Sequence, residues 1–163
     1  MVGYLFVHFD SFYARYRIPE SLSAKINSHL KAQILDAKNY TLYDDAVSVL
    51  HACTNMGFKH YMLSNNFPEL PLVVRGLGLS KYFVDYIVSA HIGYEKPRAE
   101  IFQHALEIAN FPKICYMIGD NPVADVQGGK AAGMRTILVH RDVLFDAVHH
   151  CRTLSEVSAL LSA

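Results

Sequence analysis

The chain has 163 residues, of which 52% are hydrophobic and 18% are charged, and its 15 basic and 15 acidic residues give a formal net charge of zero. This length predicts one domain with a buried core. The composition argues against a disordered chain and against the broad basic surface of a nucleic-acid-binding protein. No run of about 18 apolar residues is present, so we expect no membrane span. The three cysteines are far apart in the sequence, which is typical of reduced thiols in a cytoplasmic protein.

Short apolar runs alternate with segments of helical periodicity. Continuous apolar runs indicate strands that are buried on both faces of a parallel sheet. The expected elements are, in order, a strand at Gly3–Phe9, helices at Pro19–Leu35 and Asp44–Met56, a strand at Tyr61–Ser64, an irregular segment at 67–80, a strand at Asp85–Ser89, a helix at Pro97–Ala109, a strand at Ile114–Ile118, a helix at Val123–Ala132, a strand at Thr136–Val139, and one or two helices within Val143–Leu161. This alternation predicts an α/β fold with a doubly wound, Rossmann-like sheet of mostly parallel strands.

Polar and charged residues follow four of the expected strands. Ligands of doubly wound sheets bind at the carboxyl ends of the strands, so these residues are the candidates for a functional site. They are His8, Asp10, Ser64, Asn65, Lys96, Asp120 and Asp125. A hydroxyl, backbone N–H groups and a lysine suit a phosphate group, and carboxylates suit a hard divalent cation.

Each of these residues also has a purely structural interpretation. Asp120 or Asn121 would suit a helix N-cap, and an aspartate in the first turn complements the helix dipole. Ser64-Asn65 is also a common turn pair, and Lys96 is also explained as a solvated charge. The order of the four positions along the chain is what favours a site.

The sequence resembles the haloacid dehalogenase (HAD) superfamily over residues 2–140. YMLSNN, with Ser64, is similar to the second motif of that family. EKPRAEIF, with Lys96, is similar to the third motif, and GDNPVAD, with Asp120 and Asp125, to the fourth. Most members are magnesium-dependent phosphohydrolases, so the resemblance implies a phosphatase-like hydrolase with Mg²⁺ as cofactor.

The first motif departs from the family pattern, in which an apolar strand leads to Asp-x-Asp. Aligned on the expected strand Gly3–Phe9, Asp10 takes the acid/base position and His8 takes the place of the nucleophile. Imidazole is a poor ligand for Mg²⁺, and loss of a covalent nucleophile costs on the order of a million-fold in turnover. We therefore expect a pseudoenzyme with weak or no classical phosphatase activity.

Three alternatives stay open for this motif. His8 itself, or Asp10 in a register shifted by two residues, would serve as the nucleophile of an active phosphohydrolase. The chain would otherwise be a non-catalytic module that binds phosphate or another protein. His8 would also fit a buried, hydrogen-bonded core position.

The resemblance also implies the following ligands and organisation. The metal ligands would be Asp10, Asp120 and Asp125. The catalytic residues would be His8, Asp10, Ser64 and Lys96. Phosphate would bind to Ser64, Asn65 and Lys96, and the partner would be a small phosphorylated metabolite or a phosphate or sulfate anion. Residues 1–163 would form one domain with a small helical cap insert at about 13–42. This insert could also form the interface of a homo-oligomer. No nucleic acid or membrane partner is expected.

Overall fold

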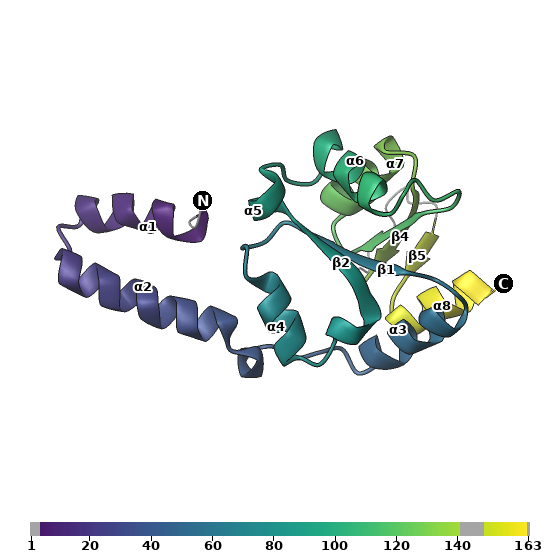
Figure 1. Cartoon of the computed structure of the whole chain (residues 1–163), viewed down its shortest axis with the longest axis horizontal. Helices are drawn as coiled ribbons and strands as arrows, with labels where there is room; N and C mark the ends of the chain where they lie inside the picture. The colour runs from purple at the N-terminus through teal and green to yellow at the C-terminus, as the bar shows by residue number, and fades with distance from the viewer. Residues whose placement is uncertain (1–3, 141–148, 163) are drawn as a thin grey trace.

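The computed structural model describes residues 4–140 and 149–162. A pair of N-terminal helices extends away from an α/β body that holds the strands (Figure 1). The first part of the expected C-terminal helical segment, up to residue 148, lies outside the described residues. None of the described helices is long and apolar enough to span a membrane.

The N-terminal segment is helical, so the expected strand at Gly3–Phe9 is wrong. Helix α1 spans Tyr4–Arg15 and helix α2 spans Glu20–Leu35, close to the expected Pro19–Leu35. The Tyr13 hydroxyl donates a hydrogen bond of 2.8 Å to Asn27 Oδ1, which ties the two helices together. A short apolar run does not distinguish a buried strand from a helix, and the apolar residues from Leu5 to Tyr16 recur at helical spacing of three and four.

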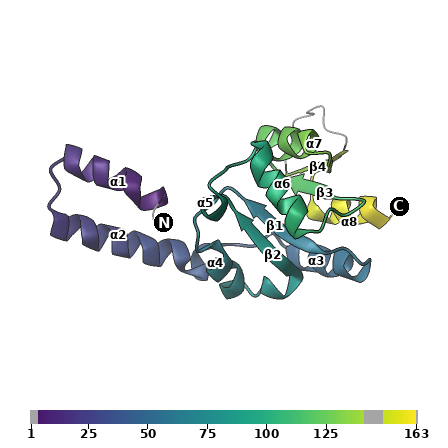
Figure 2. The ribbon, with the colours of Figure 1, turned by 45° about the horizontal axis from the view of Figure 1, so that its top comes forward.

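This hairpin lies apart from the sheets in both views (Figures 1 and 2). Lys31 on α2 forms an ion pair of 2.7 Å with Glu69, which precedes helix α4. The hydrogen bond from Lys31 lowers the pKa of Glu69 below its usual value. The pair is partly exposed, and such surface pairs contribute little stability. The 3-10 turn η1 (Ala37–Asn39) then leads into the α/β body.

The four later strand predictions are confirmed, with ends shifted by at most two residues. The described strands are β1 (His60–Ser64), β2 (Phe83–Val88), β3 (Tyr116–Gly119), β4 (Arg135–Val139) and β5 (His149–Cys151). The remaining helices are α3 (Ala46–Asn55), α4 (Leu70–Gly76), the 3-10 turn η2 (Ser80–Tyr82), α5 (Ser89–Ile92), α6 (Ala99–Ile108), the π-helix η3 (Pro122–Gln127), α7 (Gly128–Ala131) and α8 (Leu154–Ser162). Strand β5 was not expected from the sequence.

The strands form two parallel sheets among the described residues. Strand β1 pairs with β2, and a separate sheet has the order β3-β4-β5. Leu63 lies opposite Ile87 in the first sheet, and Ile118 lies opposite Ile137 in the second. The α/β fold class with parallel strands is therefore confirmed, although the sheet is divided between β1 and β3.

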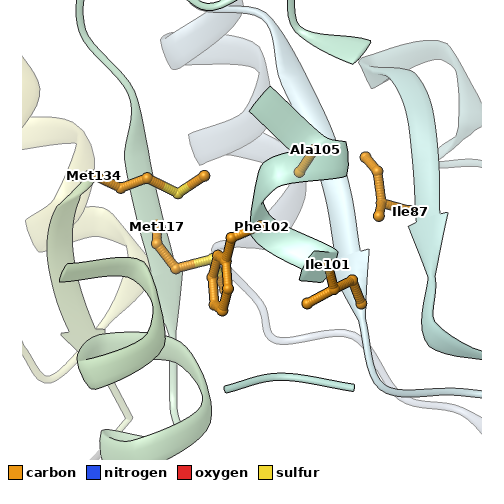
Figure 3. Packing of buried hydrophobic residues seen from close by; sticks show 6 residues of the cluster. All are labelled: Ile87, Ile101, Phe102, Ala105, Met117 and Met134. Carbon is orange, nitrogen blue, oxygen red and sulfur yellow. The ribbon is translucent and has the colours of Figure 1, made fainter. Parts of the chain in front are cut away.

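Helix α6 packs across the two sheets and joins them through one apolar cluster. Its Ile101 and Phe102 are fully buried. Ile101 lies toward Ile87 of β2, whereas Phe102 lies against Met117 of β3 (Figure 3). Ala105 and Met134 complete the buried part of the cluster. On the opposite side of the strands, α3 packs against α8. The two sheets are thus held together by helices on both faces.

Candidate functional site

The candidate site is built around Lys96, which connects the carboxyl ends of β1 and β3. Its ammonium donates a hydrogen bond of 2.8 Å to the Leu63 carbonyl oxygen of β1. It donates a second, of 2.6 Å, to Oδ1 of Asp125, which follows β3. Both side chains of this ion pair are largely buried, with 10% of Lys96 and 5% of Asp125 exposed. The segments that carry Lys96 and Asp125 therefore meet at the carboxyl ends of β1 and β3, as the sequence predicts.

The loop that carries Lys96 is held by Asn65. The Asn65 side-chain amide donates to the Lys96 carbonyl oxygen at 2.9 Å, and its oxygen accepts from the Lys96 N–H at 2.7 Å. These paired bonds fix the backbone at Lys96 directly beside the end of β1. The Asn65 side chain thus positions the lysine, and phosphate binding at Asn65 stays a prediction.

Asp125 is fixed from two directions. Its Oδ2 accepts a hydrogen bond of 3.0 Å from the Asn121 N–H, while Oδ1 is paired with Lys96. A Cβ atom at position 119 would collide with this carboxylate, so only Gly119 fits at the end of β3. The Asn121 side chain accepts from the N–H groups of Val123 and Ala124 and caps the π-helix η3. The capping interpretation of this motif is thus confirmed for Asn121.

Ser64 and Asp120 lie at the same edge as Lys96. Ser64 is the last residue of β1 and is half-buried, and Asp120 directly follows the last residue of β3 and is exposed. Asn66, after β1, donates its N–H to the Ser89 hydroxyl at 3.0 Å and so joins the end of β1 to the start of α5. This edge thus combines the Ser64 hydroxyl, the hydrogen-bonded Lys96 ammonium and the exposed Asp120 side chain.

His8 and Asp10 do not belong to this edge. Both lie on helix α1 and not on a strand, and α1 stands apart from the sheets (Figure 1). The interpretation of His8 as the residue in the nucleophile position, and of Asp10 as acid/base and metal ligand, depended on the expected strand, and helix α1 does not support it. The shifted register that would make Asp10 the nucleophile loses its support for the same reason.

The described residues do not fit a complete magnesium site. No group of three His, Cys, Asp or Glu side chains within residues 4–140 and 149–162 is placed to hold a metal. Of the expected ligands, Asp10 lies on α1, and both carboxylate oxygens of Asp125 accept hydrogen bonds from the protein. A site built on Asp120 would leave most of the roughly six ligands of Mg²⁺ to water.

Sequence reasoning missed the roles of the Leu63 carbonyl, Gly119 and Ser89. A backbone carbonyl carries no side-chain signal, so only the fold reveals that Leu63 anchors Lys96. Gly119 was visible as part of the GD motif, where a glycine after a strand is a sign of close packing. Nothing in the sequence pattern connects Ser89 with Asn66.

Comparison with known proteins agrees with this geometry. Residues 8–133 match the haloacid dehalogenase-like hydrolase family, and the chain belongs to it. It is 35% identical over 101 residues to human haloacid dehalogenase-like hydrolase domain-containing protein 3, which covers 61% of this chain and 40% of that protein. It is also 32% identical over 108 residues to a phosphoserine phosphatase of Thermus thermophilus, with 65% and 43% coverage.

Solved structures of HAD proteins have a similar fold. A HAD phosphatase from Thermococcus onnurineus superposes with a TM-score of 0.75 at 23% identity, covering 87% of this chain and 70% of that one. A HAD-hydrolase of Bacillus subtilis, described as putative and solved with magnesium bound, superposes with a TM-score of 0.70 at 28% identity, covering 78% and 58%. The chain spans less than half the length of the two curated relatives named above.

Proposed function

We propose that the chain binds the phosphate group of a small phosphorylated molecule at the edge formed by Ser64 and Lys96. The observation that carries this proposal is the placement of the Lys96 ammonium between the Leu63 carbonyl and Asp125 at the carboxyl ends of two strands. An ammonium has three N–H donors. Two of them bond to the protein, and the third is the one that we assign to a phosphate oxygen.

Two further features support an anion at this place. The half-buried Ser64 hydroxyl ends the strand whose Leu63 carbonyl anchors Lys96, so one ligand can be held by both side chains. The Asn65 amide holds the lysine backbone from both its N–H and its carbonyl, so little side-chain and loop entropy is lost on binding. The name of the Thermus thermophilus relative, phosphoserine phosphatase, is consistent with a small phosphorylated ligand.

We further propose that the chain by itself is a weak phosphatase. Classical turnover in this family needs an aspartate nucleophile and Mg²⁺, and the described residues bring no three-carboxylate group to this edge. Lys96 and Ser64 can orient a phosphate and stabilise its charge, but they cannot replace a covalent nucleophile. Binding without efficient hydrolysis is therefore the expected behaviour.

The remaining expectations from the sequence stand as proposals. The small helical cap insert at about 13–42, which contains α2, stays a prediction. Phe12 and Tyr16 on helix α1 are 50% and 60% exposed, which would suit a homo-oligomer interface. The cytoplasmic location also stays a prediction, and the three free thiols are compatible with it.

Titration calorimetry with inorganic phosphate tests the binding proposal. We expect saturable binding to the native chain and about tenfold weaker binding to Ser64→Ala, because one hydrogen bond from the hydroxyl to the phosphate is lost. The double variant Lys96→Gln/Asp125→Asn removes the ammonium while keeping a neutral hydrogen-bonded pair, and it should abolish binding. The matched control is Lys130→Gln, an exposed lysine on α7. Equal phosphate affinity in the double variant and the control would refute the proposal.

Turnover of p-nitrophenyl phosphate with added Mg²⁺ tests the second part. We expect a rate near the uncatalysed background for the native chain. Rapid, magnesium-dependent hydrolysis that disappears in Asp120→Asn would show that the edge is a complete phosphatase site.

A further inference from the structure

Two stacked rings lie at the carboxyl end of β4. The imidazole of His140, which directly follows β4, is nearly parallel to the phenol ring of Tyr43. The ring centroids are 3.9 Å apart, and the planes are inclined by 11°. We refer to these two side chains as the ring pair. The proposed phosphate site uses neither of them.

The ring pair lies at the same edge of the sheets as the proposed phosphate site. Gly119, the last residue of β3, pairs with Leu138 of β4, so the two strands end side by side. The Lys96 ammonium is bound to Asp125, just after β3. His140 follows the neighbouring strand, so we estimate that one to two strand spacings, about 5–10 Å, separate the ring pair from the phosphate site.

The Tyr43 ring is held in place before any ligand binds. One of its faces rests on the His140 imidazole. Two residues further on, the Asp45 carboxylate accepts hydrogen bonds of 2.8 Å and 3.0 Å from the N–H and the hydroxyl of Ser155, at the start of helix α8. These contacts restrict the segment that carries the ring, so a ligand that stacks on it orders little further structure.

The position of His140 is energetically unfavourable. Its backbone has a φ of 56°, in the left-handed region that is strained for most residues other than glycine. Its Nε2 atom is buried and has no hydrogen-bond partner within residues 4–140 and 149–162. Strained residues and unsatisfied buried groups of this kind concentrate at functional sites. Both features therefore favour a function for the imidazole beside Tyr43.

The second face of Tyr43 is open to solvent. The residue is 61% exposed although His140 covers one side of its ring. A flat aromatic ring can stack on the open face without displacing a protein side chain. Stacking of this kind accepts any nucleobase, because every base has a π-face.

We propose that the ring pair binds the base of a nucleoside 5′-monophosphate, stacked on the open face of Tyr43, while the phosphate binds at Ser64 and Lys96. This inference rests on the proposed function and names the class of its ligand. An aryl phosphate would be too short to reach both places, which are about 5–10 Å apart, whereas the sugar of a nucleotide supplies a spacer between phosphate and ring.

Titration calorimetry with three probes tests the inference. The probes are adenosine 5′-monophosphate (AMP), ribose 5-phosphate, which lacks the base, and inorganic phosphate. We expect AMP to bind the native chain about tenfold more tightly than ribose 5-phosphate, because one base gains a stacking partner. Tyr43→Ala should reduce the affinity for AMP to that for ribose 5-phosphate and leave the affinity for inorganic phosphate unchanged.

Three further variants separate ring stacking from a general loss of structure. Tyr43→Phe keeps the ring and should keep the tight binding of AMP. His140→Asn should weaken AMP binding by about threefold, because it removes the ring behind Tyr43, while asparagine tolerates the left-handed backbone. The matched control is Tyr16→Ala, at a 60% exposed position on α1, which should change none of the affinities. The circular dichroism spectrum of each variant should match that of the native chain.

Equal affinity of the native chain for AMP and ribose 5-phosphate would overturn the inference and leave the proposed phosphate site intact. Tight AMP binding that persists in Tyr43→Ala would also overturn it, because the base would then bind elsewhere. If none of the three probes binds saturably, this inference and the proposed function both fail.

Discussion

Removal of the Lys96 ammonium should destabilise the chain strongly, because it leaves Asp125 buried without its charge partner. The ion pair spans 2.6 Å, and its side chains are 10% and 5% exposed. Breaking one partner of such a buried pair costs about 3–5 kcal/mol, whereas replacing both by neutral groups of similar shape is often close to neutral. We therefore expect Lys96→Met to lower the free energy of unfolding by about 3–5 kcal/mol and Lys96→Met/Asp125→Asn to recover at least about half of that loss.

Urea denaturation followed by far-ultraviolet circular dichroism measures this difference, since the chain has no tryptophan. The control is Arg98→Met, which breaks the exposed pair of 2.6 Å between Arg98 and Glu100 and should leave the midpoint unchanged. The reasoning is refuted if Lys96→Met is no more destabilised than Arg98→Met. It is also refuted if the double variant is as unstable as Lys96→Met, since the charge on Asp125 would then not be the cause.

Three further predictions concern stability. Gly119→Ala should destabilise the chain by about 1–3 kcal/mol in urea, because its Cβ would collide with the Asp125 carboxylate; an unchanged midpoint would show that the carboxylate moves freely. Phe102→Ala should cost about 3–5 kcal/mol in the same assay because Phe102 is fully buried between the sheets, while Phe111→Ala, at a 60% exposed position, should cost far less; equal costs would contradict the packing. Burial lowers the pKa of His60, so the unfolded chain takes up the proton first as the pH falls, and stability should decrease below about pH 6.5 by at most about 1.4 kcal/mol per pH unit for this group. His60→Asn should flatten that part of a urea-midpoint profile, and an unchanged slope would assign the effect to other groups.

The α/β body was predictable because its strands leave a strong local signal. Runs such as Tyr61–Ser64 and Thr136–Val139 are mostly apolar and carry no charge, which matches strands between layers of helices. The meeting of Lys96 with Asp125 was also predictable, because carboxyl ends of parallel strands gather at one edge. Strand β5 was missed because His149–Cys151 is short and contains two histidines, so its position depends on pairing with β4.

The N-terminus shows where local pattern fails. The residues from Tyr4 to Arg15 contain an apolar run that fits a strand and an apolar spacing that fits a helix. A strand there would have filled the sheet and supplied the first motif, which is why the sequence favoured it. Helix α1 instead packs on α2, where the Tyr13 hydroxyl donates a hydrogen bond of 2.8 Å to Asn27 Oδ1. Because α1 is helical, no strand pairs between β1 and β3 among the described residues, and the sequence pattern did not predict this division of the sheet.

A crystal structure of the native chain soaked in inorganic phosphate is the most direct test of the proposed site. The predicted result is an anion within hydrogen-bond distance of both Lys96 Nζ and Ser64 Oγ, at the carboxyl ends of β1 and β3. The contradicting result is an edge that stays without an anion at phosphate concentrations that saturate the calorimetric binding, with the phosphate bound at another surface.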